Sequence, residues 1–356
     1  METTPATRCP GATLPAQPVA TARGERWTNP HRLLPRARWA VQLAYLAFLA
    51  WVGVEFARFF ALAAGEGPIT AARPPAVEGF LPIAALVGLK RFLLTRYWDE
   101  IHPAGLTIFV AAIATAFLAR KAFCSWVCPV GTISRALEWV GGKLLWRRRW
   151  PAVPRALDLP LTAVKYLLLA FFLWSVAQMP AEALQGFIHS PYNAAVDGKM
   201  LLFFAHPSTF ALGVLGVLVA LSLVVKHFWC RYLCPYGALL GLASLLSPVS
   251  VRRDPAACND CRACSRACPA EIPVHRRLRV LSTECTGCMS CVSACRARDC
   301  LGVTRRGSRA WSPWVVPALA LATMLGCWAV ARASGFWETA LTPEAFRMAY
   351  RLMGIG

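Results

Sequence analysis

Two matching runs of cysteines lie close together between residues 258 and 295. Each has the spacing C-x2-C-x2-C-x3-C, which is typical of bacterial proteins that hold two [4Fe–4S] clusters for one-electron transfer. In that pattern the first three cysteines of a run ligate one cluster, and the fourth ligates the cluster of the other run. The spacing therefore predicts one cluster on Cys258, Cys261, Cys264 and Cys295, and a second on Cys285, Cys288, Cys291 and Cys268.

Zinc and disulfides are the alternatives for so many cysteines. A zinc site needs four ligands per ion and is usually built from two separated C-x2-C pairs, which gives no reason for triplets with a distant fourth cysteine. The second run has Arg296 where proline usually follows the last cysteine, but that proline shapes the loop and is no ligand. Four nearby arginines would raise the cluster potentials or simply form a solvated basic surface: Arg262, Arg266, Arg296 and Arg298.

A second motif, C-x3-C-P-x-G, occurs twice before these runs. The first copy holds Cys124 and Cys128, and the second holds Cys230 and Cys234. The proline after each second cysteine marks a helix end or the first turn of a new helix. Four such ligands suit a third iron–sulfur or other soft-metal centre, or a redox-active dithiol; the alternative is apolar cysteines buried in a core. The remaining cysteines are expected to be bystanders: Cys9, Cys300 and Cys327.

The elements that position these cysteines are predicted to be membrane helices. Hydrophobic residues make up 57% of the 356 positions, and an apolar stretch of about 20 residues spans a bilayer. Five stretches predict an all-α polytopic membrane protein: 39–63, 104–119, 161–179, 209–225 and 314–331. The second and fourth are short unless flanking basic residues extend to the interface. A small α+β ferredoxin insert with two clusters is expected between the fourth and fifth helices.

Basic residues in the loops predict the orientation, because cytoplasmic loops carry an excess of Lys and Arg. They are abundant before the first stretch, after the second and around the ferredoxin runs, and scarcer elsewhere. This places the N-terminus and the insert in the cytoplasm and the C-terminus in the periplasm of a bacterial inner membrane. The net charge of +20 then reflects this bias and contact with anionic lipid rather than nucleic-acid binding.

The membrane part is predicted to contain an internal repeat. His102-Pro103, an apolar stretch and the first C-x3-C-P-x-G are matched by His206-Pro207, an apolar stretch and the second copy. Each unit then has two helices, and the units pack in parallel about a pseudo-two-fold axis along the membrane normal. The expected division is a disordered cytoplasmic tail (1–34), two membrane repeats (35–150 and 151–250), the insert (252–305), a last helix (310–333) and a periplasmic tail (334–356).

Three further sets of polar residues are candidates for function. His102 and His206 are candidates for a quinol site, since imidazole titrates near neutral pH, although a His-Pro at a helix start is also an ordinary cap. Glu55 and Arg58 lie inside the first apolar stretch, where charges are either functional or a satisfied pair near the interface. His227 is a candidate partner of the nearby Cys230.

These motifs resemble the membrane-bound polyferredoxins that include NapH, MauN and the C-terminal part of NosR. The resemblance covers roughly residues 35–335 and rests on both C-x3-C-P motifs, both ferredoxin runs, and the segments 78–82 and 102–106. The copper-oxidase assembly factor CcoG is a more distant relative. The chain looks most like the NapH/MauN branch, because it has no room for the flavin-binding domain of NosR or the β-rich domain of CcoG. The resemblance implies electron transfer from membrane quinol toward periplasmic enzymes.

Three functions fit these observations. The first is an electron carrier between the quinol pool and a periplasmic redox enzyme or its donor, with the membrane, quinol and a periplasmic or membrane-bound redox protein as partners. The second is reduction of a metal such as copper, or maturation of a metallocentre. The third is a membrane redox sensor or scaffold. No nucleophile, acid–base pair or substrate pocket is evident, so any catalysis is redox, and whether the chain is itself an enzyme stays open.

Overall fold

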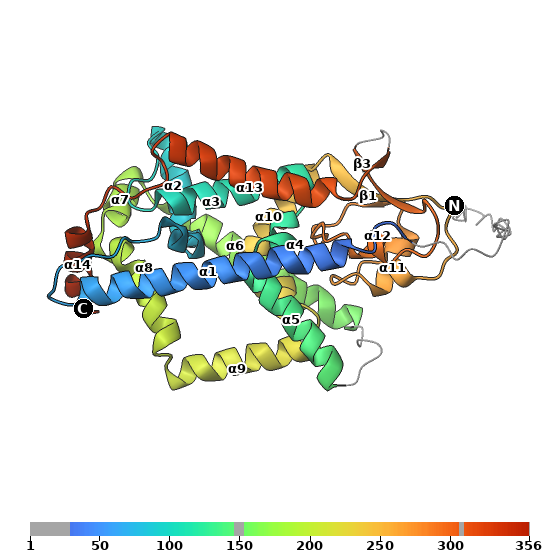
Figure 1. The fold of residues 1–356 in the computed structure, drawn as a ribbon, viewed down its shortest axis with the longest axis horizontal. Helices are drawn as coiled ribbons and strands as arrows, with labels where there is room; N and C mark the ends of the chain where they lie inside the picture. The colour runs from blue at the N-terminus through green and yellow to red at the C-terminus, as the bar shows by residue number, and fades with distance from the viewer. Residues whose placement is uncertain (1–28, 146–152, 306–309, 356) are drawn as a thin grey trace, which may run out of the picture.

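The computed structural model describes residues 29–145, 153–305 and 310–355, and these form an elongated, mostly helical molecule (Figure 1). The predicted tail up to residue 28 and the predicted boundary between the repeats at 150 lie outside the described residues. The helices before the insert are α1 (Leu34–Ala64), η1 (Pro75–Phe80), α2 (Pro82–Thr95), α3 (Pro103–Ala119), α4 (Ala122–Trp126), α5 (Pro129–Leu144), α6 (Arg155–Gln178), α7 (Ala181–Ile188), α8 (Pro191–Ala205), α9 (Thr209–Val224), η2 (Trp229–Leu233), α10 (Pro235–Ala243) and η3 (Ser244–Leu246).

Within the described residues, three helices are long and apolar enough to cross a membrane, namely α1, α6 and α13 (Val315–Ala333). A fourth crossing would need α8 and α9 together, and these two are bent by 75° at their junction. At 17 and 16 residues, α3 and α9 reach only about 25 Å at 1.5 Å per residue. The structure therefore supports three of the five predicted spans by length alone.

For a helix as short as α3 to span the bilayer, the sequence reasoning required the basic residues after it to extend to the lipid interface. They are buried inside the protein instead. Arg120 is 1% exposed, and its guanidinium donates to the carbonyls of Ser244 and Ser282 at 3.0 and 2.8 Å. The neighbouring Lys121 is 3% exposed and donates to the carbonyl of Thr283 at 3.3 Å. Both side chains attach the end of α3 to the insert.

The order of elements repeats along the chain. A long helix, a His-Pro before a shorter apolar helix, a five-residue turn of helix and a helix that starts at proline occur as α1, α3, α4 and α5, and again as α6, α9, η2 and α10. The second five-residue element is a π-helix rather than an α-helix. A two-fold axis between the units remains a prediction.

The insert contains a small antiparallel sheet with the strand order β2-β1-β3-β4. Val251 of the central strand pairs with Val280 on one side and Val303 on the other. The sheet begins before residue 252 and continues past residue 305, so it is wider than the predicted insert. Its elements are β1 (Val249–Arg253), α11 (Ala263–Arg266), η4 (Val274–Arg276), β2 (Arg279–Val280), α12 (Ser290–Ser293), β3 (Leu301–Arg305) and β4 (Ala310–Trp311).

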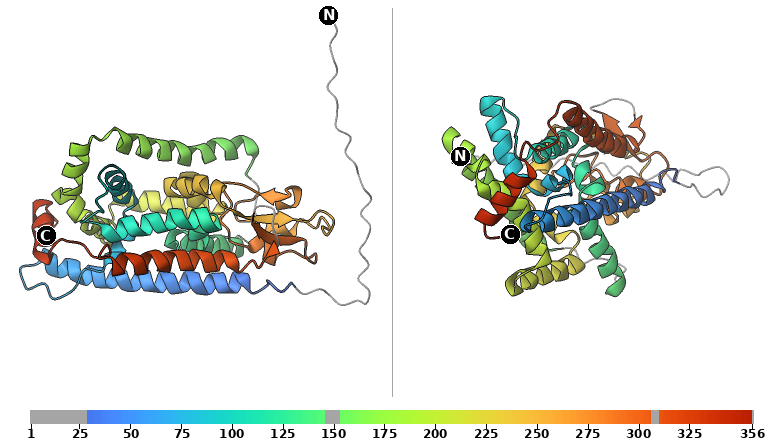
Figure 2. Two further views of the ribbon diagram at one scale, coloured as in Figure 1. Left: turned by 90° about the horizontal axis from the view of Figure 1, so that it is seen from above. Right: turned by 60° about the vertical axis from the view of Figure 1, so that its left-hand side comes forward.

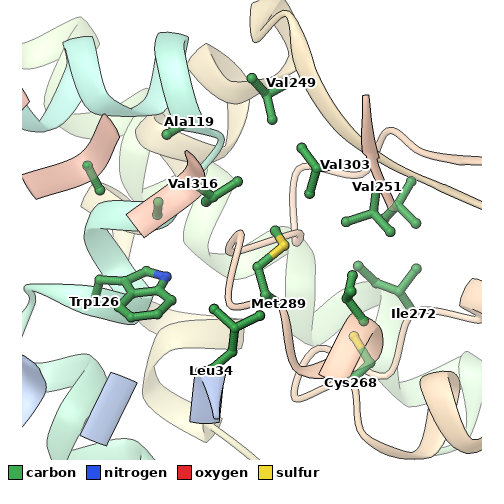
Figure 3. Packing of buried hydrophobic residues seen from close by; sticks show 14 of the residues in the cluster. Leu34, Ala119, Trp126, Val249, Val251, Cys268, Ile272, Met289, Val303 and Val316 are labelled. Carbon is green, nitrogen blue, oxygen red and sulfur yellow. The ribbon is translucent and has the colours of Figure 1, made fainter. Parts of the chain in front are cut away.

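One hydrophobic core joins the insert to the helices (Figure 3). Trp126 of α4 and Val316 of α13 pack there beside Met289, and each of these side chains is at most 2% exposed. The inner face of the sheet closes the core through Val251 and Val303. Burial of these side chains contributes about 25 cal/mol per Å² of apolar surface and so holds the insert against the helices.

The C-terminal residues form a helix, α14 (Pro343–Leu352), at the end of the molecule opposite the insert (Figure 2). Its Phe346 and Tyr350 are buried against α1 and α8. Arg347 donates to the carbonyl of Leu62 at 3.2 Å and so satisfies the C-terminal end of α1. The segment predicted as a tail is therefore part of the packed structure.

Candidate metal centre

The structure brings together the cysteines that were predicted to share a cluster. Cys268 lies near Cys288 and Cys285 of the second run. Cys264 lies near Cys295, from the second run, and Cys261. This placement fits the exchange of fourth cysteines that is known in dicluster ferredoxins, and the ligand assignment stays a prediction.

The two runs share the same local backbone. Arg262 and Met289 both have a φ of 57° and precede the one-turn helices α11 and α12. Such left-handed residues are uncommon outside glycine, and here each occupies the same place in its run, directly after the second cysteine. Within the described residues, no three His, Cys, Asp or Glu side chains converge closely enough for a single metal ion.

The surroundings of Cys288 in the second run favour thiolate, whereas burial raises the pKa of the Cys291 thiol. Burial acts to raise the pKa of the Cys288 thiol, but Arg38 and the hydroxyl of Ser290 outweigh it, and the pKa is lowered. Arg38 also donates to the carbonyl of Cys288 at 3.1 Å. Since iron–sulfur clusters are held by thiolates, these contacts fit the predicted cofactor.

Sequence reasoning treated Cys300 as a bystander, and the structure places it beside the first cluster's ligands. The residue is 3% exposed, and its thiol lies within hydrogen-bonding reach of Cys258 and Cys295. Its position five residues after Cys295 was the signal available in the sequence.

Replacing Cys295 with alanine should leave the first cluster in place, because the thiol of Cys300 can take the vacant iron. The variant is expected to keep its full iron content, with a changed EPR spectrum. The double variant Cys295→Ala with Cys300→Ala should lose about four irons per chain. Cys300→Ala alone should match the wild type; a loss of iron in Cys295→Ala alone would contradict the expectation.

The four C-x3-C-P cysteines also lie together. The thiol of Cys124 has Cys128, Cys234 and Cys230 among its electrostatic neighbours, so the two motif copies meet as predicted. All four cysteines line one end of a cavity of about 1570 Å³. The cavity follows α1 and reaches Arg73 and Phe346 at its other end.

Proline fixes the second cysteine of each pair, and glycine is required in the first copy of the motif. Cys128 is the N-cap of α5 and Cys234 is the N-cap of α10, and a proline follows each as the first helical residue. A Cβ on Gly131 would clash with the carbonyl oxygen of Cys124. Only glycine therefore allows the helix start to pack this closely against the first cysteine.

Polar groups surround the sulfur atoms of this quartet. The backbone N–H of Gly237 donates to Cys234 Sγ at 3.2 Å, and Ser134 Oγ lies 3.4 Å from Cys230 Sγ. His227, predicted as a partner of Cys230, hydrogen-bonds to that thiol and to Glu138, with 3.1 Å between Nε2 and the carboxylate. Donors of this kind stabilise thiolates and tune metal centres.

The second ferredoxin run lies directly against the quartet. Ser125, between Cys124 and Cys128, donates to the carbonyl of Thr286 at 2.7 Å, and Trp126 donates to that of Gly287 at 3.3 Å. Glu284 accepts from the fully buried Lys165 of α6 at 2.6 Å. The loop that carries Cys285 and Cys288 is thus bonded to α4 and α6.

The two candidate histidines do not lie together. His102 is 1% exposed at the start of α3, and its Nε2 donates to the carbonyl of Asn193 at 2.8 Å. His206 is exposed at the opposite end of α8 from Asn193, about 20 Å away by helix rise. His102 and Cys124 also lie at opposite ends of α3, which spans about 25 Å. A quinol site shared by the two histidines is not formed.

His102 instead belongs to a buried charged network that sequence reasoning missed. Arg73 bridges Glu78 and Asp197 at 2.6 and 2.8 Å, and all three side chains are at most 4% exposed. Glu78 accepts the N–H of Gly105 at the start of α3 at 3.0 Å. Burial acts to raise the pKa of Glu78, but Arg73 brings it below its usual value. Burial likewise acts to lower the pKa of His102, and Glu78 raises it.

The remaining predicted residues have simpler surroundings. Glu55 and Arg58 form an ion pair of 2.8 Å, with 67% of the arginine side chain exposed. This is the satisfied pair that was the alternative to a functional role. Cys327 is half-buried on α13, and Cys9 lies outside the described residues.

The helices, the crossed ferredoxin runs and the cysteine quartet define a membrane protein that binds iron–sulfur clusters. A family model described as a 4Fe-4S binding domain matches residues 101–151 and 207–253, which contain the quartet. A second model, described as a 4Fe-4S dicluster domain, matches residues 250–296. No solved structure matches the chain.

Named relatives match more than half of the chain. YccM of Escherichia coli strain K12, whose name describes an electron transport protein, is 40% identical over 336 residues, covering 92% of this chain and 93% of that protein. The ferredoxin-type protein NapH of the same organism is 30% identical over 219 residues, covering 58% of this chain and 70% of NapH. The chain belongs to the NapH-type membrane-bound polyferredoxins, which are iron–sulfur electron-transfer proteins.

Proposed function

We propose that this protein passes electrons between membrane quinol and a periplasmic redox enzyme or its donor, through three iron–sulfur centres. Cys258, Cys261, Cys264 and Cys295 would hold one, Cys285, Cys288, Cys291 and Cys268 the second, and Cys124, Cys128, Cys230 and Cys234 the third. Iron–sulfur clusters supply one-electron redox chemistry over a wide range of potentials.

One observation carries this proposal: the quartet and the second ferredoxin run meet at the same cavity. Cys124 and Cys128 line the cavity together with Cys288 and Glu284, and the hydrogen bonds from α4 fix the loop of the second run beside them. The match of a 4Fe-4S binding model to both quartet segments supports iron and sulfide as the third centre.

The cavity suits an amphipathic ligand such as quinol. Its volume exceeds the 300–1,000 Å³ usual for small-molecule sites, and Trp51, Leu325 and Trp328 give it apolar walls for a hydrocarbon tail. Gln42 and Arg135 line the cavity near the quartet and hydrogen-bond to each other at 3.0 Å. They would orient a hydroxylated ring there, whereas His102 is too distant. The proposed orientation keeps the insert cytoplasmic and α14 periplasmic.

The test is to purify the protein without oxygen, assay iron and sulfide, and record EPR during titration with a quinol analogue. We expect about twelve irons per chain, as three cubanes require, and clusters that quinol reduces. The double variant Cys128→Ala with Cys234→Ala should keep about eight irons and lose reduction by quinol, while dithionite still reduces its ferredoxin clusters. Cys327→Ala is the matched control.

Two outcomes would count against this function. Unchanged reduction by quinol in the quartet variant would remove the quartet from the electron path. Eight irons and no response of the wild-type clusters to quinol would favour the sensor or metal-handling alternatives.

A further inference from the structure

The two ferredoxin runs have different surroundings. The loop of the second run is bonded to α4 and α6, whereas the loop of the first run lies at the surface. The hydrogen bonds of this first loop are exposed and local: Asp254 accepts the N–H of Ala256 at 2.9 Å, and Cys258 Sγ lies 3.6 Å from Asp260. The first cluster site is therefore the one that a molecule from solution can approach.

The surface around this first site is strongly basic. Besides Arg305 at the end of β3, seven arginines of the insert are exposed, against three exposed aspartates. The other acidic residues of the insert, Glu271 and Glu284, are paired with Arg231 and Lys165 on the side that faces the helices. Among the described residues, Arg298 alone of the seven has an ion-pair partner, Asp299, at 3.6 Å. We call these seven the basic surface: Arg252, Arg262, Arg266, Arg276, Arg277, Arg296 and Arg298.

Several members of the basic surface adjoin the first site itself. Arg266 donates to the carbonyl of Cys261 at 2.8 Å, and Arg296 directly follows Cys295. Arg262 lies between Cys261 and Cys264 in the sequence, and Arg276 follows His275, whose Nδ1 lies 2.8 Å from the Oγ of Ser265, the residue after Cys264. Positive charge thus adjoins Cys261, Cys264 and Cys295, and Asp260 is the acidic neighbour of Cys258.

We propose that the basic surface docks an acidic, soluble electron-carrier protein of the flavodoxin or ferredoxin kind. In each encounter one electron passes between the carrier and the first cluster. In the reducing direction the carrier is oxidised by one electron and the cluster is reduced by one, and no bond forms or breaks. This inference deepens the proposed function, since it rests on the same clusters and adds a partner at the end of their path.

Two observations favour a protein over anionic lipid as the occupant. The insert lies at the end of the long axis, beyond the helices that a bilayer would surround (Figures 1 and 2). The arginines also adjoin a redox centre, which a lipid headgroup cannot use. Opposite charges steer proteins together and raise their association rates by 10–10³-fold at low salt.

The test uses the full chain with its clusters, in nanodiscs of neutral lipid, and an acidic flavodoxin in its two-electron-reduced form as the probe. Stopped-flow absorbance follows cluster reduction at ionic strengths of about 10 mM and about 0.5 M. The double variant Arg276→Glu with Arg296→Glu should slow reduction about tenfold or more at low salt. At high salt the difference should vanish, because screening shortens the reach of the charges.

The matched control is Arg332→Glu with Arg351→Glu, which makes the same change in charge near the other end of the molecule. It should reduce at the wild-type rate, and all three proteins should have equal iron contents and EPR spectra after dithionite. Equal rates for the two double variants, or a wild-type rate independent of salt, would overturn the proposal. So would a wild type in anionic nanodiscs that reacts as slowly as the basic-surface variant, since lipid would then cover the surface.

A separate titration with quinol keeps this result apart from the proposed function. Fast, salt-dependent reduction by flavodoxin in a protein that ignores quinol would support the docking surface and contradict the quinol link. Reduction by quinol, together with a rate of reduction by flavodoxin that the charge variants do not change, would support the quinol link and contradict the docking surface.

Discussion

Replacing Arg73 with methionine should destabilise the protein more than any other single change among its ion pairs. The variant would leave the carboxylates of Glu78 and Asp197, both 0% exposed, without their cation. Removing one partner of a buried pair costs about 3–5 kcal/mol, which corresponds to a fall in Tm of roughly 5 °C or more for a chain of this length. Thermal unfolding of the detergent-solubilised protein, followed by tryptophan fluorescence, measures this shift.

Arg58→Met is the matched control, because Arg58 makes an ion pair of similar length that is largely exposed. Exposed pairs are worth about 0–1 kcal/mol, so its Tm should barely change. Adding Glu78→Gln and Asp197→Asn to Arg73→Met should restore part of the lost stability by removing the unpaired charges. If Arg73→Met and Arg58→Met unfold at the same temperature, water reaches the network and the burial argument is wrong.

Replacing Cys288 with alanine should remove about four irons per chain, the content of one cubane, and loosen the contact between the insert and the helices. Cys288 is a predicted ligand of the second cluster, and Arg38 is bonded to its carbonyl. Metal-binding energy is folding energy in such small modules, so the loop that α4 holds through Thr286 and Gly287 should lose order. Iron assay and hydrogen exchange of residues 282–288 measure the two effects.

Cys327→Ala, a half-buried thiol on α13, should change neither quantity. A Cys288→Ala protein with full iron content would show that another residue ligates the second cluster. A loss of iron without faster exchange in the loop would show that the core around Met289 and Trp126 holds the insert without its cluster.

The dicluster domain was predictable because the pattern that binds a cluster is local. Three cysteines within seven residues specify the loop, and the exchange of fourth cysteines follows from two such runs in sequence. The long helices α1, α6 and α13 were predictable for a similar reason, since hydropathy over 20 residues reports on a single element. The meeting of the two C-x3-C-P pairs also followed, because the repeat indicated that two equal units come together.

The buried charged network around Arg73 was not predictable, because its partners are far apart in the sequence. Arg73 and Asp197 are separated by 124 residues, and no spacing rule connects a loop after α1 with the first turns of α8. The repeat was in fact misleading there. It made His102 and His206 equal candidates for a quinol site. In the structure Glu78 and Asn193 surround His102, whereas the bend between α8 and α9 leaves His206 exposed. Cys300 was missed because it lies outside the motif, and the turn after Cys295 is what brings it beside Cys258 and Cys295.

The attachment of the insert has a consequence for the pace of turnover. Two residues, Ser247 and Pro248, connect η3 to β1, and three connect β4 to α13. Asn29 adds a clamp, since its amide donates to the carbonyls of Val292, Ser293 and Cys295 at 2.8 to 3.1 Å. Carrier domains on long flexible linkers collect electrons at one place and deliver them at another. This insert is fixed on the helices instead, so its partners must diffuse to it. The frequency of their encounters therefore sets the upper limit on its rate of electron transfer.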